Sequence, residues 1–275
     1  MAGAVRALRY RRAVSPPPVS HPPVTLSEGD GVRYLHLGSV WVQGAMRIRS
    51  PQFVHLDYVQ RMLASLLWLD SAAVGQGQAL QLGLGAGAIT RFTRGSLGMP
   101  TTVVELNPWV IEVCRRYFRI DTDDKLLQMI CADAGAWLRA QQLGGLVQLL
   151  HVDLYDHEAA APVLDDVDFY AHCRRMLAPG GVMSVNLFGR RSSYADSAAK
   201  VAAVFGTDQV WSLQPTREGN TALIAGRDVV VPAREVLQAR AESIEKRFAA
   251  IGLQASKWLR MVRPYRADTA LAEPR

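Results

Sequence analysis

At residues 79–90 an apolar run breaks into closely spaced glycines and then resumes helical spacing, with the sequence ALQLGLGAGAIT. The pattern predicts a strand, a tight turn and a helix. Glycines at Gly83, Gly85 and Gly87 let the backbone turn sharply and approach a ligand, because no Cβ is in the way. The helix that follows offers unpaired N–H groups at its start. These features indicate a binding site for a nucleoside cofactor.

The glycine spacing alone does not identify the nucleoside. Gly83, Gly85 and Ala88 also satisfy the G-x-G-x-x-G/A fingerprint of dinucleotide-binding folds. The next apolar run, residues 102–106, carries Glu105 at 22 positions after Gly83. A second strand of either fold presents a carboxylate to ribose hydroxyls at this place. A dehydrogenase therefore stays open as an alternative.

Composition limits the class of protein. The 275 residues are 49% hydrophobic, which is enough for one main domain with a smaller attachment. The net charge of +6 comes largely from arginine, and the basic residues are dispersed apart from the segment Arg6 to Arg12. We therefore expect no nucleic-acid partner.

The cysteine, histidine and hydropathy patterns argue against a metal site and against a membrane-spanning protein. Cys114, Cys131 and Cys173 lack C-x-x-C spacing and the 6 histidines show no ligand spacing, so we expect buried free thiols and no metal. No run approaches the roughly 18 to 20 apolar residues of a membrane span, and the N-terminus lacks an apolar leader. We expect a soluble, cytoplasmic protein that does not bind membranes.

Three parts are expected along the chain. Residues 1–25 combine arginines with prolines and predict a disordered tail. Residues 26–72 predict a small antiparallel sheet, from the alternation at 32–43, and a linking amphipathic helix that ends near Asp70. Residues 73–275 predict an α/β domain that ends in a helix.

Strand and helix patterns alternate in the third part. Predicted strands at 79–82, 102–106, 127–132 and 146–152 are separated by helical patterns, which indicates a mainly parallel sheet. The remaining predicted elements are a helix at 167–176, a turn at 177–181, a strand at 182–188, a helix at 195–205, strands at 209–214 and 220–225, and a helix at 233–251.

Acidic residues follow three successive strands. Glu105 and Asp133 each end one strand, and Asp153 and Asp156 follow the next. Ligands of open α/β sheets bind at the carboxyl ends of the strands, so we expect these acids and the glycine turn to meet at one edge. Helix capping and turn formation are the structural alternatives, because Asp is common in both roles.

The combined pattern resembles the class I AdoMet-dependent fold from Gln78 to Gly226, a Rossmann-like fold with a mainly parallel seven-stranded sheet. The matching segments are the glycine motif at 82–87, the ribose-binding strand end at Glu105, the adenine-binding acid Asp133 with Ala134, and the turn Pro179-Gly180-Gly181 before the fifth strand.

Within that superfamily the chain resembles the spermidine synthases, which are polyamine aminopropyltransferases, as a divergent bacterial member. Trp41-Val42-Gln43 resembles a strand that ends in a donor-contacting glutamine. Asp57-Tyr58 lies on a helix where the family carries a substrate-side motif. Residues 152–156, VDLYD, resemble the D-x-x-D loop with the family's catalytic carboxylates.

This resemblance implies transfer of the aminopropyl group of decarboxylated AdoMet to a polyamine such as putrescine, with release of methylthioadenosine, by a homodimer. The donor contacts that it implies are Gln43, Gly83, Gly85, Gly87, Glu105, Asp133 and Ala134. On the acceptor side it implies that Asp156 accepts a proton, Asp153 positions the amine and Tyr155 holds the reacting nitrogen, next to Asp57, Tyr58 and His157.

The chemistry of aminopropyl transfer explains why carboxylates are expected in the D-x-x-D loop. A primary amine with a pKa of about 10 is an ammonium at neutral pH and cannot attack carbon until its proton leaves. A nearby carboxylate can receive that proton. Negative side chains also attract the amine and the positively charged sulfur of the donor.

Two departures from the family pattern keep other functions open. Ala86 stands where the family carries an acid that holds the donor's amine, and His157 instead of a proline follows Asp156. An AdoMet-dependent methyltransferase is therefore the first alternative. A catalytically silent nucleoside-binding protein on the same fold is the second, because fold does not imply function.

Overall fold

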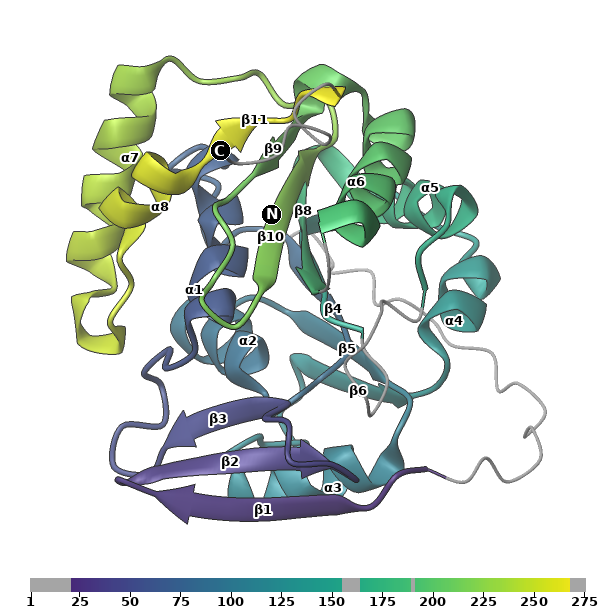
Figure 1. Ribbon diagram of the computed structural model, residues 1–275, viewed down its shortest axis with the longest axis vertical. Helices are drawn as coiled ribbons and strands as arrows, with labels where there is room; N and C mark the ends of the chain where they lie inside the picture. The colour runs from purple at the N-terminus through teal and green to yellow at the C-terminus, as the bar shows by residue number, and fades with distance from the viewer. Residues whose placement is uncertain (1–20, 155–163, 189–190, 268–275) are drawn as a thin grey trace, which may run out of the picture.

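The structure, a computed structural model, describes residues 21–154, 164–188 and 191–267 (Figure 1). It contains a three-stranded sheet and an eight-stranded sheet. The larger sheet lies between two layers of helices, and the small sheet lies below it in Figure 1. Residues 1–20 of the predicted tail lie outside the described residues.

The small sheet is antiparallel, as predicted, and consists of β1 (Val24–Gly29), β2 (Val32–Leu37) and β3 (Gly44–Arg47). Strand β1 is not among the predicted elements, and the expected boundary at residue 25 falls inside it. Asp30 and Gly31 join β1 to β2 with φ of 51° and 74°, as a two-residue hairpin turn requires. Residues 41–43, expected to end a strand, lie in the connection between β2 and β3.

The eight-stranded sheet has the order β11-β9-β10-β8-β7-β4-β5-β6. The five strands from β8 to β6 are parallel. The other three pair antiparallel: β10 with β8, β9 with β10, and β11 with β9. This order confirms the predicted Rossmann-like α/β fold and adds one short strand, β11. The bounds are β4 (Gln78–Leu82), β5 (Thr101–Glu105), β6 (Leu127–Cys131), β7 (Val147–Val152), β8 (Leu177–Phe188), β9 (Val210–Ser212), β10 (Asn220–Gly226) and β11 (Arg263–Pro264).

The turn predicted at 177–181 is an irregularity inside β8. Leu177 pairs with Val147 of β7, and Val182 pairs with Leu149. The chain therefore advances five positions along β8 while it advances two along β7. Gly180 has φ of 76° within this bulge. A bulge bends a strand without ending it.

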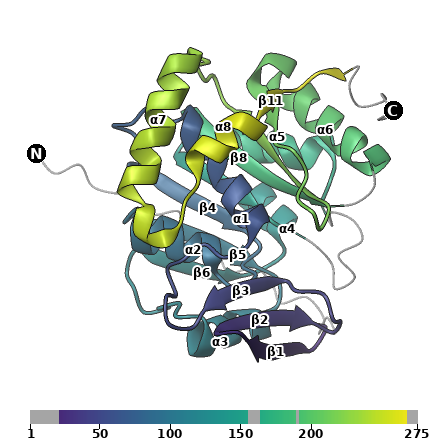
Figure 2. The ribbon, with the colours of Figure 1, turned by 60° about the vertical axis from the view of Figure 1, so that its left-hand side comes forward.

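Helices cover both faces of the large sheet (Figure 2). One face carries α4 (Ala134–Ala140), α5 (Val167–Met176) and α6 (Arg191–Phe205), and the other carries α1 (Asp57–Met62), α7 (Arg234–Arg247) and α8 (Ala255–Met261). The short α2 (Ala88–Thr90) continues as a π-helix to Ser96, and α3 (Pro108–Tyr117) packs beside β1 of the small sheet. No helix in the described ranges is long and apolar enough to cross a membrane.

Two predicted helices end earlier than the sequence pattern indicates. The linking helix ends as α1 at Met62 and continues as a 3₁₀ helix, Leu63–Trp68. The terminal helix ends at Arg247, and a 3₁₀ turn, Ala249–Ile251, stops at Gly252 with φ of 78°. A left-handed glycine is a common helix stop, and it redirects the chain into α8, which the prediction lacks.

Candidate active site

A cavity of about 650 Å³ is lined by the small sheet, by α1 and by residues at the carboxyl ends of β4, β5, β6 and β7. Ligand pockets commonly measure about 300 to 1,000 Å³, so the cavity has the size of a small-molecule site. Of the predicted site residues, those that line the cavity are Gln43, Asp57, Tyr58, Gly83, Gly85, Glu105, Asp133, Ala134 and Asp153. Tyr155, Asp156 and His157 lie outside the described residues.

Gly83 brings the glycine turn against the strand end that carries Asp153. Its φ is 85°, and a Cβ there would lie 2.1 Å from the Asp153 carbonyl oxygen. Gly87 does not line the cavity: it caps α2 with φ of 71°, and a Cβ there would lie 2.7 Å from Cδ1 of Ile120. Packing therefore requires glycine at 87, and its contact with the donor stays a prediction.

Glu105 is held at the end of β5 by the backbone. Its Oε2 accepts a hydrogen bond from the Leu84 N–H at 2.8 Å, and its Oε1 accepts one from the Asn107 N–H at 2.8 Å. Burial raises the pKa of this carboxyl, and backbone hydrogen bonds from Asn107, Leu84 and Leu106 act against that rise. A carboxylate has about four acceptor sites, so Glu105 can still accept a ligand hydroxyl.

Asp133 is a helix cap and also a cavity-lining residue. It is the N-cap of α4, where its Oδ1 accepts the Ala136 N–H at 2.7 Å. It also lines the cavity together with Ala134. The capping bond uses one carboxylate oxygen and fixes the side chain at the cavity wall.

Asp153 follows β7 and is bound at both carboxylate oxygens. The Asn186 side-chain nitrogen donates to its Oδ1 at 2.9 Å, and the Tyr58 hydroxyl donates to its Oδ2 at 3.2 Å. The Asn220 side-chain nitrogen in turn donates to Oδ1 of Asn186 at 3.2 Å, which orients the Asn186 amide. Burial raises the pKa of Asp153, while the Asn186 and Tyr58 bonds lower it.

Helix α1 and the hairpin between β9 and β10 supply one wall of the cavity. Asp57 forms an ion pair with Arg61 at 2.7 Å, and Arg61 also donates to the backbone oxygen of Gln214. Glu218 lines the cavity from this hairpin. Its pKa is lowered by hydrogen bonds to its own backbone and to Thr216, and by the charges of Arg61 and Arg217.

Several lining residues are absent from the sequence-based prediction: Tyr34, His55, Asn186, Glu218 and Asn220. Asn186 lies near the carboxyl end of β8, so the rule that found Asp153 would have found it. Glu218 and Asn220 carry no such signal, because their place depends on the antiparallel pairing of β10 with β8.

Gln43 and Ala86 show how the small sheet meets the glycine turn. A Cβ on Gly44 would lie 2.5 Å from both the Cβ and the backbone nitrogen of Ala86, so β3 packs directly on residue 86. Ala86 is 2% exposed. The neighbouring Gln43 has a buried side-chain nitrogen without a partner in the described part of the chain. Buried polar groups are rarely unbonded, so this nitrogen is available for a hydrogen bond that the described residues do not supply.

The cavity is acidic. The carboxylates that line it are Asp57, Glu105, Asp133, Asp153 and Glu218, and its described lining residues include no Lys or Arg. The lining residue His55 has its pKa lowered by burial and by the Arg47 charge, so it is neutral at neutral pH. Within the described ranges, no group of at least three His, Cys, Asp or Glu side chains is arranged to hold a metal ion.

This sheet order, with a glycine turn and acids at successive strand ends, is the Rossmann-like fold that spermidine synthase and methyltransferase structures share. The chain belongs to the spermine/spermidine synthase family, the polyamine aminopropyltransferases. The spermine/spermidine synthase domain model matches residues 83–213. A polyamine aminopropyltransferase of Chromobacterium violaceum is 30% identical over 263 residues, which cover 95% of this chain and 97% of that protein.

Solved structures agree on the fold. A probable spermidine synthase from Corynebacterium glutamicum is similar with a TM-score of 0.68 and 19% identity, over 89% of this chain and 93% of that chain. Human methyltransferase-like protein 13 in complex with SAH is similar with a TM-score of 0.57 and 18% identity, over 77% of this chain and 96% of that chain.

Proposed function

We propose that the protein transfers the aminopropyl group of decarboxylated AdoMet to a polyamine such as putrescine and releases methylthioadenosine. The acidity of the cavity carries this proposal. Both reactants are cations, and carboxylates attract both of them. Intact AdoMet would add a carboxylate that finds no Lys or Arg among the described lining residues.

The donor's nucleoside lies at the glycine turn in this proposal. Glu105 accepts hydrogen bonds from the ribose hydroxyls, and Asp133 with Ala134 binds the adenine. The unpartnered side-chain nitrogen of Gln43 donates to the donor. These four residues come from the β2–β3 connection, the end of β5 and the start of α4, so the donor bridges the small sheet and the large one.

On the acceptor side, Asp153 orients the amine and Asp156 takes its proton. Asp153 suits orientation because both of its oxygens are already fixed by Tyr58 and Asn186. The freed nitrogen lone pair attacks the methylene next to sulfur, the carbon–sulfur bond breaks, and sulfur leaves as a neutral thioether. Tyr155 holds the reacting nitrogen and His157 lies near the acceptor; with Asp156, these residues lie outside the described structure and their roles rest on the family resemblance.

Mass spectrometry of the products tests the proposal. The protein is incubated with decarboxylated AdoMet or AdoMet, each with putrescine, cadaverine, agmatine or spermidine. We expect methylthioadenosine and a lengthened polyamine from the decarboxylated donor. In the same assay Asp156→Asn should lower kcat by about 10²- to 10⁴-fold, and unchanged turnover would reject Asp156 as the base.

Ala86 is the observation that favours the second candidate, an AdoMet-dependent methyltransferase. That function predicts S-adenosylhomocysteine and a methylated acceptor in the same assay. Contact with Gly44 gives Ala86 a packing role that does not depend on the donor. Nucleoside binding without any product would support the silent binding protein instead.

Homodimer formation and a cytoplasmic location remain predictions from the resemblance and the sequence. Light scattering of the purified full chain measures the oligomeric state directly.

A further inference from the structure

Gln81 is a buried amide in the central strand β4, directly before the glycine turn. It is 2% exposed, and the strand residues Ala79, Leu80 and Leu82 beside it are apolar and buried. A buried amide is costly unless its polar atoms are hydrogen-bonded. Gln81 does not line the cavity, so any role that it has in the reaction acts through other residues.

The Gln81 side chain joins the glycine turn to the helix that follows it. Its Nε2 donates to the Gly83 carbonyl at 2.7 Å and, more weakly, to the Leu84 carbonyl at 3.4 Å. Its Oε1 accepts the Thr90 hydroxyl at 2.6 Å. Thr90 is 1% exposed and ends α2. The two side chains thus form a closed bridge across the turn from its first residue to the helix.

The position of Gly83 affects both halves of the cavity. The Gly83 backbone packs so closely on the Asp153 carbonyl that a Cβ has no room, and Gly83 also lines the cavity. A change in the turn would therefore move the donor side and the Asp153 side together. Misplacement of reacting groups by about 1 Å can cost roughly a hundredfold in rate.

We propose that Gln81 and Thr90 are positioning residues that hold the glycine turn in the geometry that binds the nucleoside. This inference rests on the proposed function, because it takes the turn to be the donor site. The rest of the turn is also held from behind: the Cys114 thiol donates to the Gly85 carbonyl at 3.1 Å, and Arg91 donates to the Ala86 carbonyl at 2.7 Å. The Gln81–Thr90 bridge holds the Gly83 carbonyl, while Glu105 holds the Leu84 N–H.

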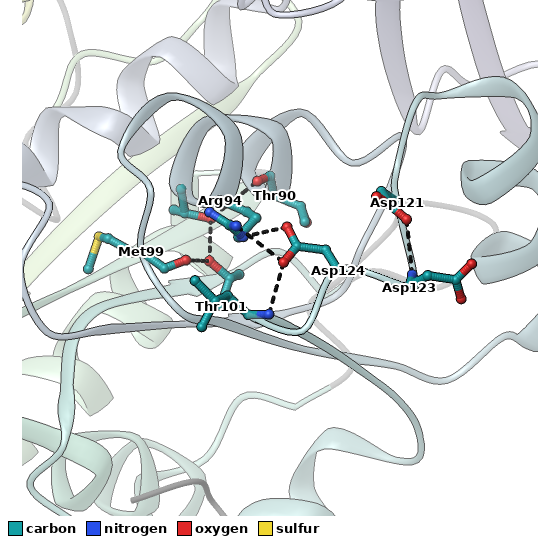
Figure 3. Close-up of polar contacts among 9 residues, drawn as sticks. Thr90, Arg94, Met99, Thr101, Asp121, Asp123 and Asp124 are labelled. Carbon is teal, nitrogen blue, oxygen red and sulfur yellow. Dashed lines mark hydrogen bonds and ion pairs between the residues drawn. The ribbon is translucent and has the colours of Figure 1, made fainter. Parts of the chain in front are cut away.

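Thr93 provides a matched control three residues further along the chain. Its hydroxyl is equally buried, but it donates to the carbonyls of Ile89 and Thr90 and accepts from Thr101, and it has no bond to the turn. Thr101 itself donates to the Met99 carbonyl, beside the Arg94–Asp124 ion pair (Figure 3). Loss of the Thr93 hydroxyl therefore removes a buried hydroxyl while it leaves the side-chain hydrogen bonds of Gln81 and Thr90 in place.

The experiment compares Gln81→Leu, Thr90→Val, Thr90→Ser and Thr93→Val in the full chain. Calorimetry gives the Kd of methylthioadenosine, scanning calorimetry gives the Tm, and steady-state kinetics gives KM and kcat. We expect Gln81→Leu and Thr90→Val to weaken methylthioadenosine binding by about tenfold, as loss of a buried hydrogen bond does. Thr90→Ser should keep the wild-type Kd, and Thr93→Val should keep it whatever its Tm.

A double-mutant cycle adds a second criterion. If the two side chains act as one bridge, the double variant Gln81→Leu/Thr90→Val should bind no more weakly than Gln81→Leu alone. The inference is wrong if Thr90→Val and Thr93→Val change the Kd alike, or if Thr90→Val lowers only the Tm. Failure of the wild-type chain to bind methylthioadenosine would instead remove the proposed function, and this inference with it.

Discussion

The Tyr58 hydroxyl of α1 donates to Oδ2 of Asp153, a residue 95 positions later in the sequence. This bond ties the helix that follows the small sheet to the strand end of the large one. It also acts on the pKa of Asp153, because hydrogen bonding to the carboxylate counters the rise caused by burial.

Tyr58→Phe should impair use of the acceptor amine. A hydrogen bond to a charged group contributes about 1.5 to 3 kcal/mol, so we expect kcat/KM to fall by about 10- to 100-fold. The acid limb of the pH profile should move to higher pH, because the pKa of Asp153 rises further without the bond. Tyr170→Phe removes a similar Tyr–Asp bond, to Asp165 at 2.7 Å and away from the cavity, and serves as the control. Equal profiles for both variants would contradict the assignment.

The capping role of Asp133 and its proposed contact with the donor can be tested separately. Asp133→Ala removes both roles, whereas Asp133→Ser keeps a capping oxygen and removes the carboxylate. Both variants should weaken donor binding, while only Asp133→Ala should lose about 0.5 to 2 kcal/mol of stability. Asp166→Ala removes the cap of α5, where Asp166 accepts the Phe169 N–H at 2.7 Å, and should lower the Tm alone. If Asp133→Ser binds donor as the wild type does, the adenine contact is wrong.

The close contact between Gly44 and Ala86 predicts that the glycine turn has no room for an acidic side chain at position 86. Ala86→Asp and Gly44→Ala should each cost about 1 to 3 kcal/mol, measured by urea unfolding, because the contact has no free space. Neither should bind the decarboxylated donor more tightly. Gly29→Ala, where a Cβ meets nothing within 4 Å, is the control for glycine replacement. Tighter donor binding by a stable Ala86→Asp protein would show that the contact gives way.

His151 predicts a loss of stability in mild acid. Burial lowers its pKa from 6.5 to about 4, so the folded protein binds fewer protons than the unfolded chain between these values. The contribution of His151 is complete above pH 6.5 and falls by roughly 3 kcal/mol as the pH drops to about 4.

His151→Gln isolates the pH-dependent contribution of His151 to stability, because glutamine keeps a polar partner for the Ser184 hydroxyl. That hydroxyl lies 2.7 Å from the His151 ring nitrogen. The stability difference between wild type and variant should shrink steadily over this pH range in urea titrations. A difference that does not change with pH would mean that His151 is protonated in the folded protein.

Much of the fold follows from local sequence signals. The glycine turn and the strands before Glu105 and Asp153 are short-range patterns, and the structure has them where the pattern predicts. The edge rule for parallel sheets then brought Glu105, Asp133 and Asp153 to one cavity. Their common location could be predicted from the positions and the direction of the strands alone.

The missing parts depend on contacts between distant segments. The π-helix that continues α2 and the bulge at Gly180 do not follow from periodicity. The hairpin that delivers Glu218 and Asn220 is positioned by antiparallel pairing of β10 with β8, which no local pattern specifies. Strand β1 is different, because its Asp-Gly turn was a readable signal.

The hairpin between β9 and β10 has a consequence for how this protein can evolve. It brings Glu218 to the cavity on an exposed segment, whereas the glycine turn is fixed from behind by buried side chains. Loop tips tolerate replacement and insertion far better than buried turns do. The cavity wall that this hairpin forms is thus free to drift among descendants of this sequence, while the glycine turn is constrained by the core.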